Sequence, residues 1–486
     1  MNTTFFQFAT SSIHLSAALE ILCKESNTNA RNFFCYWGSS THFPGRMSNQ
    51  YESYFRRTPR KIKQLARCAD PNVVINKEMQ YDGTWVNLAI KEFLNQFNKV
   101  FTLRDLENLN FDGVKPGSAL ANELTTISKD RDFNFKANMP LVCTLLRSYL
   151  EVFSAAGEFI SMNSISRVYV FNGRFLHERA IWDSAKKRGV ECILFETMRD
   201  RYLTRGKGFH DRINNQLEML HVWEHSGLNE VEKIAIGSEY FNQLRSRANP
   251  FATSGELRFE NEKPYFVYFS NSDDEAIGFW NSWNETFGVQ IQAIKTLQEL
   301  FDQLDDKHLV IRLHPNLGNK SSKQKADWSK IRATKNSTVI SYDSKISSYQ
   351  LLDECLGSIT FGSTLGLESA YSGKPTLLLA DSGYDILGVA DKPTEWSQVA
   401  NWILKDYNLE EQELTNRQIR ACIRGFFLAK GGVSFEYCEL REVGWGAWKV
   451  VKFNGIRLKS NFFTHIYSKF ISKLKFLKVQ VRVKHG

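Results

Sequence analysis

The chain has 486 residues, which is more than one ordinary hydrophobic core organises and is typical of two α/β domains. Its 42% hydrophobic and 24% charged residues are the proportions of a folded soluble protein and exclude intrinsic disorder. The net charge of +9 is concentrated at one end, because residues 441–486 hold 11 Lys and Arg but one acidic residue, Glu442. A nucleic-acid-binding protein would carry such charge on a folded surface, so we expect no nucleic-acid partner.

The sequence carries no targeting or membrane-spanning signal. Its polar amino terminus lacks a basic stretch followed by an apolar one, and no run of about 18 apolar residues is free of charges. The eight cysteines form no C-x-x-C pair and no Cys/His cluster at metal-ligand spacing, so we expect reduced thiols and no bound metal. These features predict a cytoplasmic protein.

The amino-terminal part alternates strand and helix patterns. The aromatic run Thr4–Ala9 predicts a strand, Ile13–Cys23 has the apolar spacing of a helix, and Asn32–Trp37 predicts a second buried strand. The alternation returns at Arg167–Phe171, a predicted strand, which is followed by a predicted helix over Leu176–Arg188. Strands that are apolar throughout belong to parallel sheets covered on both faces.

A second series of strands follows the charged segment 256–264, where we place a domain boundary. Short apolar runs alternate there with helical patterns, and these runs are Tyr265–Phe269, His308–Leu313, Thr338–Ser341, Ser358–Phe361 and Pro375–Leu379. Such alternation predicts a parallel sheet. We therefore predict two Rossmann-like α/β domains facing each other across a cleft, residues 1–255 and 256–440, followed by a basic helical tail over 441–486.

The most informative segment is Val310–Asn316, with the sequence VIRLHPN. A buried strand ends here, and open α/β sheets bind ligands at the carboxyl ends of their strands. The guanidinium of Arg312 and the imidazole of His314 both donate hydrogen bonds to phosphate oxygens, and Pro315 would fix the turn. A surface turn with an incidental histidine is the alternative.

A second segment, Thr360–Leu377, also starts at the end of a predicted strand. Gly362, Ser363 and Thr364 precede a helix whose first N–H groups, together with the hydroxyls, form a site for an anion. Glu368 lies one turn into this helix, where its carboxylate is suited to ribose hydroxyls. A Gly-Ser-Thr loop is a weak signal alone, and its position about one βαβ step after the His-Pro pair strengthens it.

Together, the His-Pro pair and the segment GSTLGLESAYSGKP, residues 362–375, resemble the carboxyl-domain signature of bacterial capsule polysaccharide biosynthesis glycosyltransferases. That family includes the Kdo (3-deoxy-manno-octulosonic acid) transferases, which use a CMP-activated donor. Sialyltransferases of the GT-B type carry a similar His-Pro pair and a Ser/Thr-rich loop at matching places. The resemblance covers residues 265–380 and implies the GT-B architecture.

The resemblance also implies roles for individual residues. The histidine of the pair, His314, would contact the donor phosphate and take part in catalysis, while Ser363 and Thr364 would contact phosphate or nucleotide. Glu368 would contact the ribose. The predicted donor-binding residues are thus Arg312, His314, Pro315, Gly362, Ser363, Thr364 and Glu368.

The amino-terminal domain supplies a candidate acceptor side. Its FNGR segment, residues 171–174, is similar to acceptor-side segments of surface-polysaccharide transferases. Asn172 and Arg174 lie on a strand-to-helix turn suited to polar sugar contacts, and Arg179 follows on the helix. Glu196, at the next strand end, is the candidate general base, because an attacking acceptor hydroxyl must lose its proton. A structural ion pair or a helix cap formed by Arg174 and Glu196 is the alternative.

Aromatic residues and lysines are interleaved from 445 to 486. Between Asn461 and Leu477 apolar residues recur mostly every three or four positions with lysines beside them, which predicts a basic amphipathic helix. Such a helix is suited to an anionic membrane surface that carries a lipid-linked acceptor. Packing against the catalytic domains and binding of RNA are the alternatives.

These features and the resemblance predict a GT-B glycosyltransferase at the inner face of the cell membrane. It would move a sugar from a nucleotide-activated donor, CMP-linked or linked to UDP or GDP, to a lipid-linked or growing capsule polysaccharide or lipopolysaccharide. We expect no cofactor and no metal, because helix dipoles and basic groups can replace a divalent ion and Asp273-Asp274 forms no D-x-D motif. A nucleotide-sugar epimerase, a teichoic-acid-type polyol-phosphate transferase and a non-catalytic scaffold of an assembly complex are the alternatives.

Overall fold

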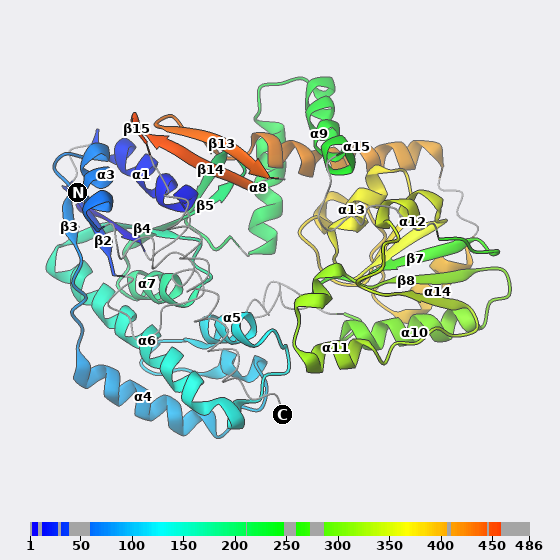
Figure 1. Ribbon diagram of the computed structural model, residues 1–486, viewed down its shortest axis with the longest axis horizontal. Helices are drawn as coiled ribbons and strands as arrows, with labels where there is room; N and C mark the ends of the chain where they lie inside the picture. The colour runs from blue at the N-terminus through cyan, green and yellow to red at the C-terminus, as the bar shows by residue number, and fades with distance from the viewer. Residues whose placement is uncertain are drawn as a thin grey trace. The chain divides into compact units, whose positions relative to one another are not determined.

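A computed structural model describes residues 2–7, 12–27, 31–37, 59–209, 211–246, 259–272, 286–405, 410–444 and 447–457 (Figure 1). The chain divides into two compact units. Unit 1 comprises Met1–His210 together with Gly432–Gly486, and unit 2 comprises Asp211–Gly431. Each unit is built on its own β-sheet.

Unit 1 is built on a seven-stranded sheet in the order β12-β6-β5-β4-β1-β2-β3. Strands β1 to β5 are parallel, β6 pairs antiparallel with β5 at one edge, and β12 pairs antiparallel with β6. The order runs outward from β1 in both directions, so the point where it reverses lies between β1 and β4. The strands are β1 (Asn2–Gln7), β2 (Arg31–Tyr36), β3 (Val74–Asn76), β4 (Ile165–Phe171), β5 (Glu191–Met198), β6 (Arg201–Arg205) and β12 (Val433–Ser434).

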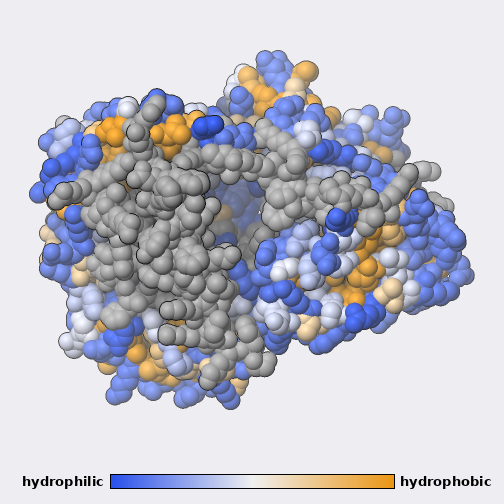
Figure 2. All heavy atoms as spheres, in the orientation of Figure 1, coloured by the Kyte–Doolittle hydropathy of each residue, from blue (hydrophilic) through white to orange (hydrophobic). Residues whose placement is uncertain are grey.

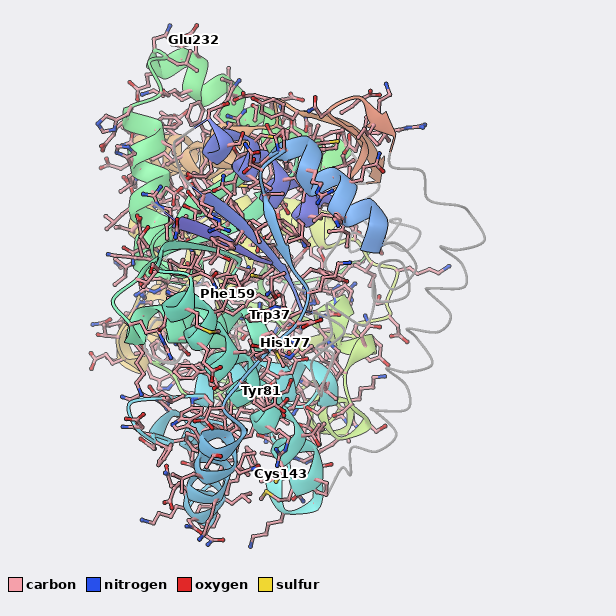
Figure 3. The ribbon with its side chains drawn as sticks, turned by 90° about the vertical axis from the view of Figure 1, so that its left-hand side faces the viewer. Trp37, Tyr81, Cys143, Phe159, His177 and Glu232 are labelled. Atoms are coloured by element: carbon pink, nitrogen blue, oxygen red, sulfur yellow. The ribbon has the colours of Figure 1, made fainter. Side chains whose placement is uncertain are left out.

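Aromatic side chains of this sheet pack against one another and against the helices of unit 1. Phe5 of β1 stacks on Tyr169 of β4, with ring centroids 4.8 Å apart. Trp37 packs edge-to-face on Phe159, and both are labelled in Figure 3. These contacts explain why the aromatic runs of the sequence form buried strands. The helices are α1 (Ser12–Ser26), α3 (Pro59–Ala69), α4 (Gly83–Phe97), η1 (Arg104–Asn108), α5 (Gly117–Ser128), α6 (Phe135–Met162) and α7 (Leu176–Lys187).

Unit 2 has a five-stranded, fully parallel sheet in the order β11-β10-β7-β8-β9. The order again runs outward from the first strand of the unit, so its reversal lies between β7 and β10. Separate apolar clusters cover the two faces of the sheet, as a parallel sheet requires. The strands are β7 (Tyr265–Phe269), β8 (His308–Arg312), β9 (Ser337–Ile340), β10 (Gly357–Thr360) and β11 (Thr376–Leu378).

The helices of unit 2 connect these strands and also precede and follow the sheet in the chain. They are α8 (Arg212–Glu224), α9 (Glu230–Ser246), α10 (Gln290–Asp302), η2 (Pro315–Asn319), α11 (Ser322–Trp328), α12 (Ser348–Glu354), α13 (Thr364–Tyr371), η3 (Asp385–Leu387), α14 (Trp396–Leu404) and α15 (Glu411–Lys430). Alternating strands and helices in both units confirm the predicted pair of Rossmann-like α/β domains.

The division between the units differs from the predicted boundary at 256. Unit 2 begins at Asp211 because α8 and α9 pack within it rather than against the first sheet. Helices α9 and α15 approach so closely that a Cβ atom added to Gly425 would lie 2.4 Å from the carbonyl oxygen of Gly237. The ring of Phe241 also stacks on Tyr371 of α13, with centroids 4.2 Å apart.

The second boundary also differs from the predicted one at 440. The chain returns to unit 1 at Gly432, and the three-stranded sheet β13 (Cys438–Gly444), β14 (Ala447–Phe453) and β15 (Ile456–Arg457) follows. Phe453 is fully buried in the core of unit 1, and the Glu20 carboxylate accepts hydrogen bonds from the backbone N–H groups of Glu436 and Tyr437. The first part of the expected helical tail is therefore strand.

The predicted amphipathic helix over 461–477 lies outside the described residues. Within the described ranges, every helix is too short or too polar to span a lipid bilayer. The described surface on the face shown in Figure 2 is mainly hydrophilic and has smaller hydrophobic areas.

Candidate functional site

The two segments singled out in the sequence lie at one edge of the unit 2 sheet. Strand β7 lies between β8 and β10, so the loops that follow these three strands are neighbours. The Ser270 hydroxyl accepts a 2.7 Å hydrogen bond from the backbone N–H of His314. The Asn271 side chain donates a 2.6 Å hydrogen bond to the carbonyl oxygen of Phe361, immediately before Gly362. The loop after β7 therefore joins the His-Pro loop to the Gly-Ser-Thr loop at the point where the strand order reverses.

The His-Pro loop is held by local hydrogen bonds. Pro315 begins the short helix η2, and the Nδ1 atom of His314 accepts a 3.1 Å hydrogen bond from the N–H of Asn316. In the neutral imidazole the proton then lies on Nε2, so Nε2 is the donor atom of the ring. The Ser272 hydroxyl accepts hydrogen bonds from the Asn316 amide at 3.1 Å and from the Lys320 ammonium at 2.8 Å.

Lys320 is a residue of this edge that the sequence analysis did not identify. It lies six positions after His314, but what brings it to the loop is the neighbouring strand β7, which places Ser272 there. The sequence did show a lysine a few residues after the His-Pro pair, and this was the signal that could have identified Lys320.

The Gly-Ser-Thr loop has a backbone that favours glycine. Gly362 has φ of +96°, and a Cβ atom there would lie 2.9 Å from the carbonyl oxygen of Asp381. Ser363 caps helix α13, and its carbonyl oxygen accepts a 2.7 Å hydrogen bond from the buried Tyr384 hydroxyl. Thr364 is the exposed first residue of α13. The loop thus presents the amino end of a helix at the carboxyl edge of the sheet.

Arg312 does not reach this edge as predicted. Its side chain is 2% exposed, and its guanidinium donates to the backbone carbonyl oxygens of Ser341 and Ser344 in the loop after β9. Burial lowers the pKa of the guanidinium. The expectation that Arg312 binds a donor phosphate is therefore corrected, because the geometry commits this side chain to holding the 341–344 loop.

Glu368 lies on α13 and points toward α12. Its Oε2 accepts a 2.7 Å hydrogen bond from the Tyr349 hydroxyl, and the guanidinium of Arg245 lies over the Tyr349 ring at 5.2 Å. Burial raises the pKa of Glu368 to about 7, against the lowering effects of the Tyr349 hydrogen bond and of Arg245. The carboxyl group retains a second oxygen for a hydroxyl partner.

A compact charged cluster follows β11, beside the Gly-Ser-Thr loop, and was not identified from the sequence. Asp385 accepts hydrogen bonds from Arg212 and Lys392 at 2.7 Å each, and Asp381 pairs with both cations. These contacts lower the pKa of Asp385 in spite of its burial. Gln216 also donates to Asp385, so the cluster fastens α8 to the end of β11.

In unit 1 the candidate base Glu196 lies beside the turn after β4. The Asn172 side chain donates to its Oε2, and Asn172 itself has φ of +53°. The Nε2 atom of His14 lies 3.9 Å from Oε1, and the His14 ring stacks on Phe171 at 4.1 Å. Burial raises the pKa of Glu196 to about 7 and lowers the pKa of His14 to about 3, so His14 is neutral at physiological pH.

The two arginines predicted on the acceptor side have different surroundings. Arg174 donates through Nε to the Asn122 side chain at 2.6 Å, and its charge lowers the pKa of Glu196. Arg179 pairs through Nε with Asp183 at 2.9 Å within α7, and the Tyr149 hydroxyl donates to the same carboxylate at 2.7 Å. For Arg179 this geometry corrects the prediction and supports a structural ion pair. Among the residues described, no three His, Cys, Asp or Glu side chains gather as metal ligands would.

A family match falls on unit 2. Residues 211–427 match the family described as capsule polysaccharide biosynthesis protein. No curated protein matches the chain in sequence. The matched residues include both the His-Pro and the Gly-Ser-Thr loops and correspond closely to unit 2, Asp211–Gly431.

Several solved structures show distant likeness. KpsC of Thermosulfurimonas dismutans, a beta Kdo 2,4 transferase, is 12% identical, with 53% of this chain and 79% of that chain covered and a TM-score of 0.34. The UDP-GlcNAc 2-epimerase of Neisseria meningitidis is 11% identical, with 88% and 98% covered and a TM-score of 0.27. CalG4, the calicheamicin glycosyltransferase, is 12% identical, with 89% and 95% covered and a TM-score of 0.29.

Likenesses at this level do not bear on activity. The family match, by contrast, falls on the two segments that carry the sequence resemblance. That resemblance is confirmed by the match of residues 211–427 to the capsule polysaccharide biosynthesis protein family.

Proposed function

We propose that the chain is a glycosyltransferase of GT-B type that acts in the synthesis of a capsule polysaccharide. The main support for this proposal is that the loop after β7 is hydrogen-bonded to both the His-Pro loop and the Gly-Ser-Thr loop. Ser270 and Asn271 tie the His-Pro loop and the Gly-Ser-Thr loop to the same edge, at the reversal of strand order where α/β sheets bind ligands.

The donor is assigned to unit 2. The Nε2–H group of His314 and the amino end of α13, with Ser363 and Thr364, are suited to an oxygen of the donor's phosphate. The remaining oxygen of Glu368 is suited to a ribose hydroxyl. The resemblance to Kdo transferases favours a CMP-activated acidic sugar, and UDP- and GDP-sugars are the other candidates.

The acceptor hydroxyl is assigned to unit 1. Its oxygen would attack the anomeric carbon while the bond from that carbon to the phosphate oxygen breaks, and the electron pair of that bond would leave with the phosphate. The proton of the hydroxyl would pass to Glu196, whose pKa of about 7 is matched to a base that works near neutral pH. Asn172 and Arg174 would orient the acceptor and the carboxylate.

The acceptor is a lipid-linked or growing surface glycan, of capsule or lipopolysaccharide. The proposed place of work is the inner face of the cell membrane, which residues 445–486 would reach through basic and aromatic side chains other than the buried Phe453. No metal or cofactor is assigned, because His314 and the helix amino end would receive the developing charge.

Calorimetric titration of the full chain with CMP, UDP and GDP tests the proposal. We expect one of the three to bind and His314→Gln to weaken that binding at least tenfold, through the loss of a hydrogen bond to a charged group. His225→Gln, an exposed histidine at the end of α8, is the matched control and should bind as the natural chain does. Absence of binding by every nucleotide would instead support a non-catalytic scaffold.

A further inference from the structure

Two histidines at the carboxyl end of α8 take no part in the proposed reaction. His221 and His225 are both exposed and stand four positions apart, which places their side chains on one face of the helix. At a rise of ~1.5 Å per residue, His225 lies about 20 Å along the helix from Arg212, which is tied to Asp385 beside the Gly-Ser-Thr loop. The pair is therefore separate from the proposed donor site.

The ring of His225 is held in one tautomer. Its Nδ1 atom lies 3.0 Å from the carbonyl oxygen of His221, which also accepts the backbone N–H of His225 at 3.0 Å. Because a carbonyl oxygen only accepts, Nδ1 carries the proton and the lone pair of the neutral ring is on Nε2. Histidines that bind metals are usually held in this way, with one ring nitrogen donating to a carbonyl or carboxylate while the other binds the metal. The local hydrogen bond thus prepares Nε2 of His225 as a ligand.

The spacing of the two rings suits a single cation bound by both. Bonds from a zinc ion to imidazole nitrogen are ~2.0–2.1 Å long, so two nitrogens that share an ion lie no more than about 4 Å apart. The rings of His221 and His225 lie side by side, with centroids 4.2 Å apart and planes inclined by 32°. The carboxyl end of a helix also carries partial negative charge, which favours a cation. Lys233 donates there to the carbonyl oxygen of Trp223 at 3.3 Å.

We infer that His221 and His225 form a binding site for a divalent transition-metal ion, independent of the proposed function. Imidazole nitrogen is a ligand of Zn²⁺, Ni²⁺ and Cu²⁺, whereas Mg²⁺ and Ca²⁺ take oxygen ligands. Among the described residues no third His, Cys, Asp or Glu joins the pair, so water molecules would complete the coordination. The ion would link the last turn of α8 to the residue that caps it and would stabilise this end of the helix.

Calorimetric titration with Ni²⁺ alone tests the inference on the full chain, prepared without a histidine tag. We expect the natural chain to bind Ni²⁺ at this pair. His221→Gln or His225→Gln should each weaken that binding by about 100-fold or more, because each removes one of two linked ligands. An excess of Mg²⁺ should not displace the ion. Ni²⁺ should also raise the unfolding temperature of the natural chain and leave that of both variants unchanged.

A control variant keeps two histidines but changes their spacing. In His221→Gln combined with Glu224→His the two rings are on adjacent positions, which face different directions, so Ni²⁺ should bind as weakly as to His221→Gln alone. The three substituted side chains are exposed, so each variant should unfold at the natural temperature when metal is absent. Equal Ni²⁺ affinity of the natural chain and the single variants would overturn the inference. So would no binding by the natural chain, or natural affinity in the control.

Discussion

The side-chain amide of Asn271 donates a 2.6 Å hydrogen bond to the carbonyl oxygen of Phe361, and so joins the loops that follow β7 and β10. The side-chain oxygen of Asn271 accepts a hydrogen bond from the side-chain amide of Gln290. In return, the backbone N–H of Asn271 donates a hydrogen bond to the side-chain oxygen of Gln290. Gln290 is itself fully buried. This exchange gives Asn271 one orientation, which places the Gly-Ser-Thr loop next to the His-Pro loop.

Asn271→Ala should therefore lower both stability and ligand affinity. The buried Gln290 amide would lose its hydrogen bond to Asn271, at a cost of about 1–3 kcal/mol in the free energy of unfolding. Nucleotide affinity should fall because the loop before Gly362 is no longer held. Denaturant unfolding and calorimetry measure the two effects, and Asn261→Ala, an exposed asparagine in the same unit, should show neither.

Gly362→Ala should disturb the loop more than its one methyl group suggests. The backbone has φ of +96° and the new Cβ would lie 2.9 Å from the Asp381 carbonyl oxygen, so the loop has to shift. We expect nucleotide binding to be lost with the rest of unit 2 intact. The control is Gly383→Ala, which has open space around the added Cβ. Equal nucleotide binding by both variants would argue against a role for the loop.

Arg312→Met should lower the free energy of unfolding rather than change the charge available to a ligand at the carboxyl edge of the unit 2 sheet. The carbonyl oxygens of Ser341 and Ser344 would lose their donor, and unfolding should become easier by about 1–3 kcal/mol. The preference for the bound nucleotide over its nucleoside should persist. If Arg312→Met abolished this preference in a stable protein, the assignment of Arg312 to holding the 341–344 loop would be wrong.

Transfer activity should depend on the ionisation of Glu196. Its raised pKa of about 7 means that kcat/KM should increase as the pH rises through about 7, when the carboxylate becomes the base. Glu196→Gln should remove this dependence and lower kcat by about 100-fold or more. Glu191→Gln, on the same strand but exposed and paired with Arg167, should keep the natural pH profile.

The same group makes stability depend on pH in a defined direction. A carboxyl group whose pKa is higher in the folded than in the unfolded chain binds a proton more tightly when folded. Its contribution is complete below the ordinary pKa of 4.5 and is lost as the pH rises through about 7. Replacement of Glu196 by Gln should remove this part of the pH dependence of thermal unfolding.

Strand positions were the part of the fold that sequence predicted best. Runs such as Tyr265–Phe269 are apolar at every position because both faces of the parallel sheet are covered, and that pattern is visible locally. The ends of these strands located His314 and Gly362. The unit boundary was missed because α8 and α9 join unit 2 through contacts with α15, almost 200 residues later in the chain.

The roles of individual side chains were harder to predict from the sequence. Arg312 and His314 are two positions apart, but the loop after β9 supplies carbonyl oxygens to the arginine, and nothing local in the sequence indicates this. Lys320 donates a hydrogen bond to Ser272, which lies in the loop after the neighbouring strand β7. Such pairings depend on strand order, which the pattern of apolar runs does not reveal.

Hydrogen–deuterium exchange of the full chain, with and without the nucleotide that it binds, tests the central claim most directly. The account predicts slower amide exchange in the three segments 270–272, 313–320 and 362–366 when the nucleotide is present. Slower exchange confined to other segments, with these three unchanged, would contradict the placement of the donor at this edge of unit 2.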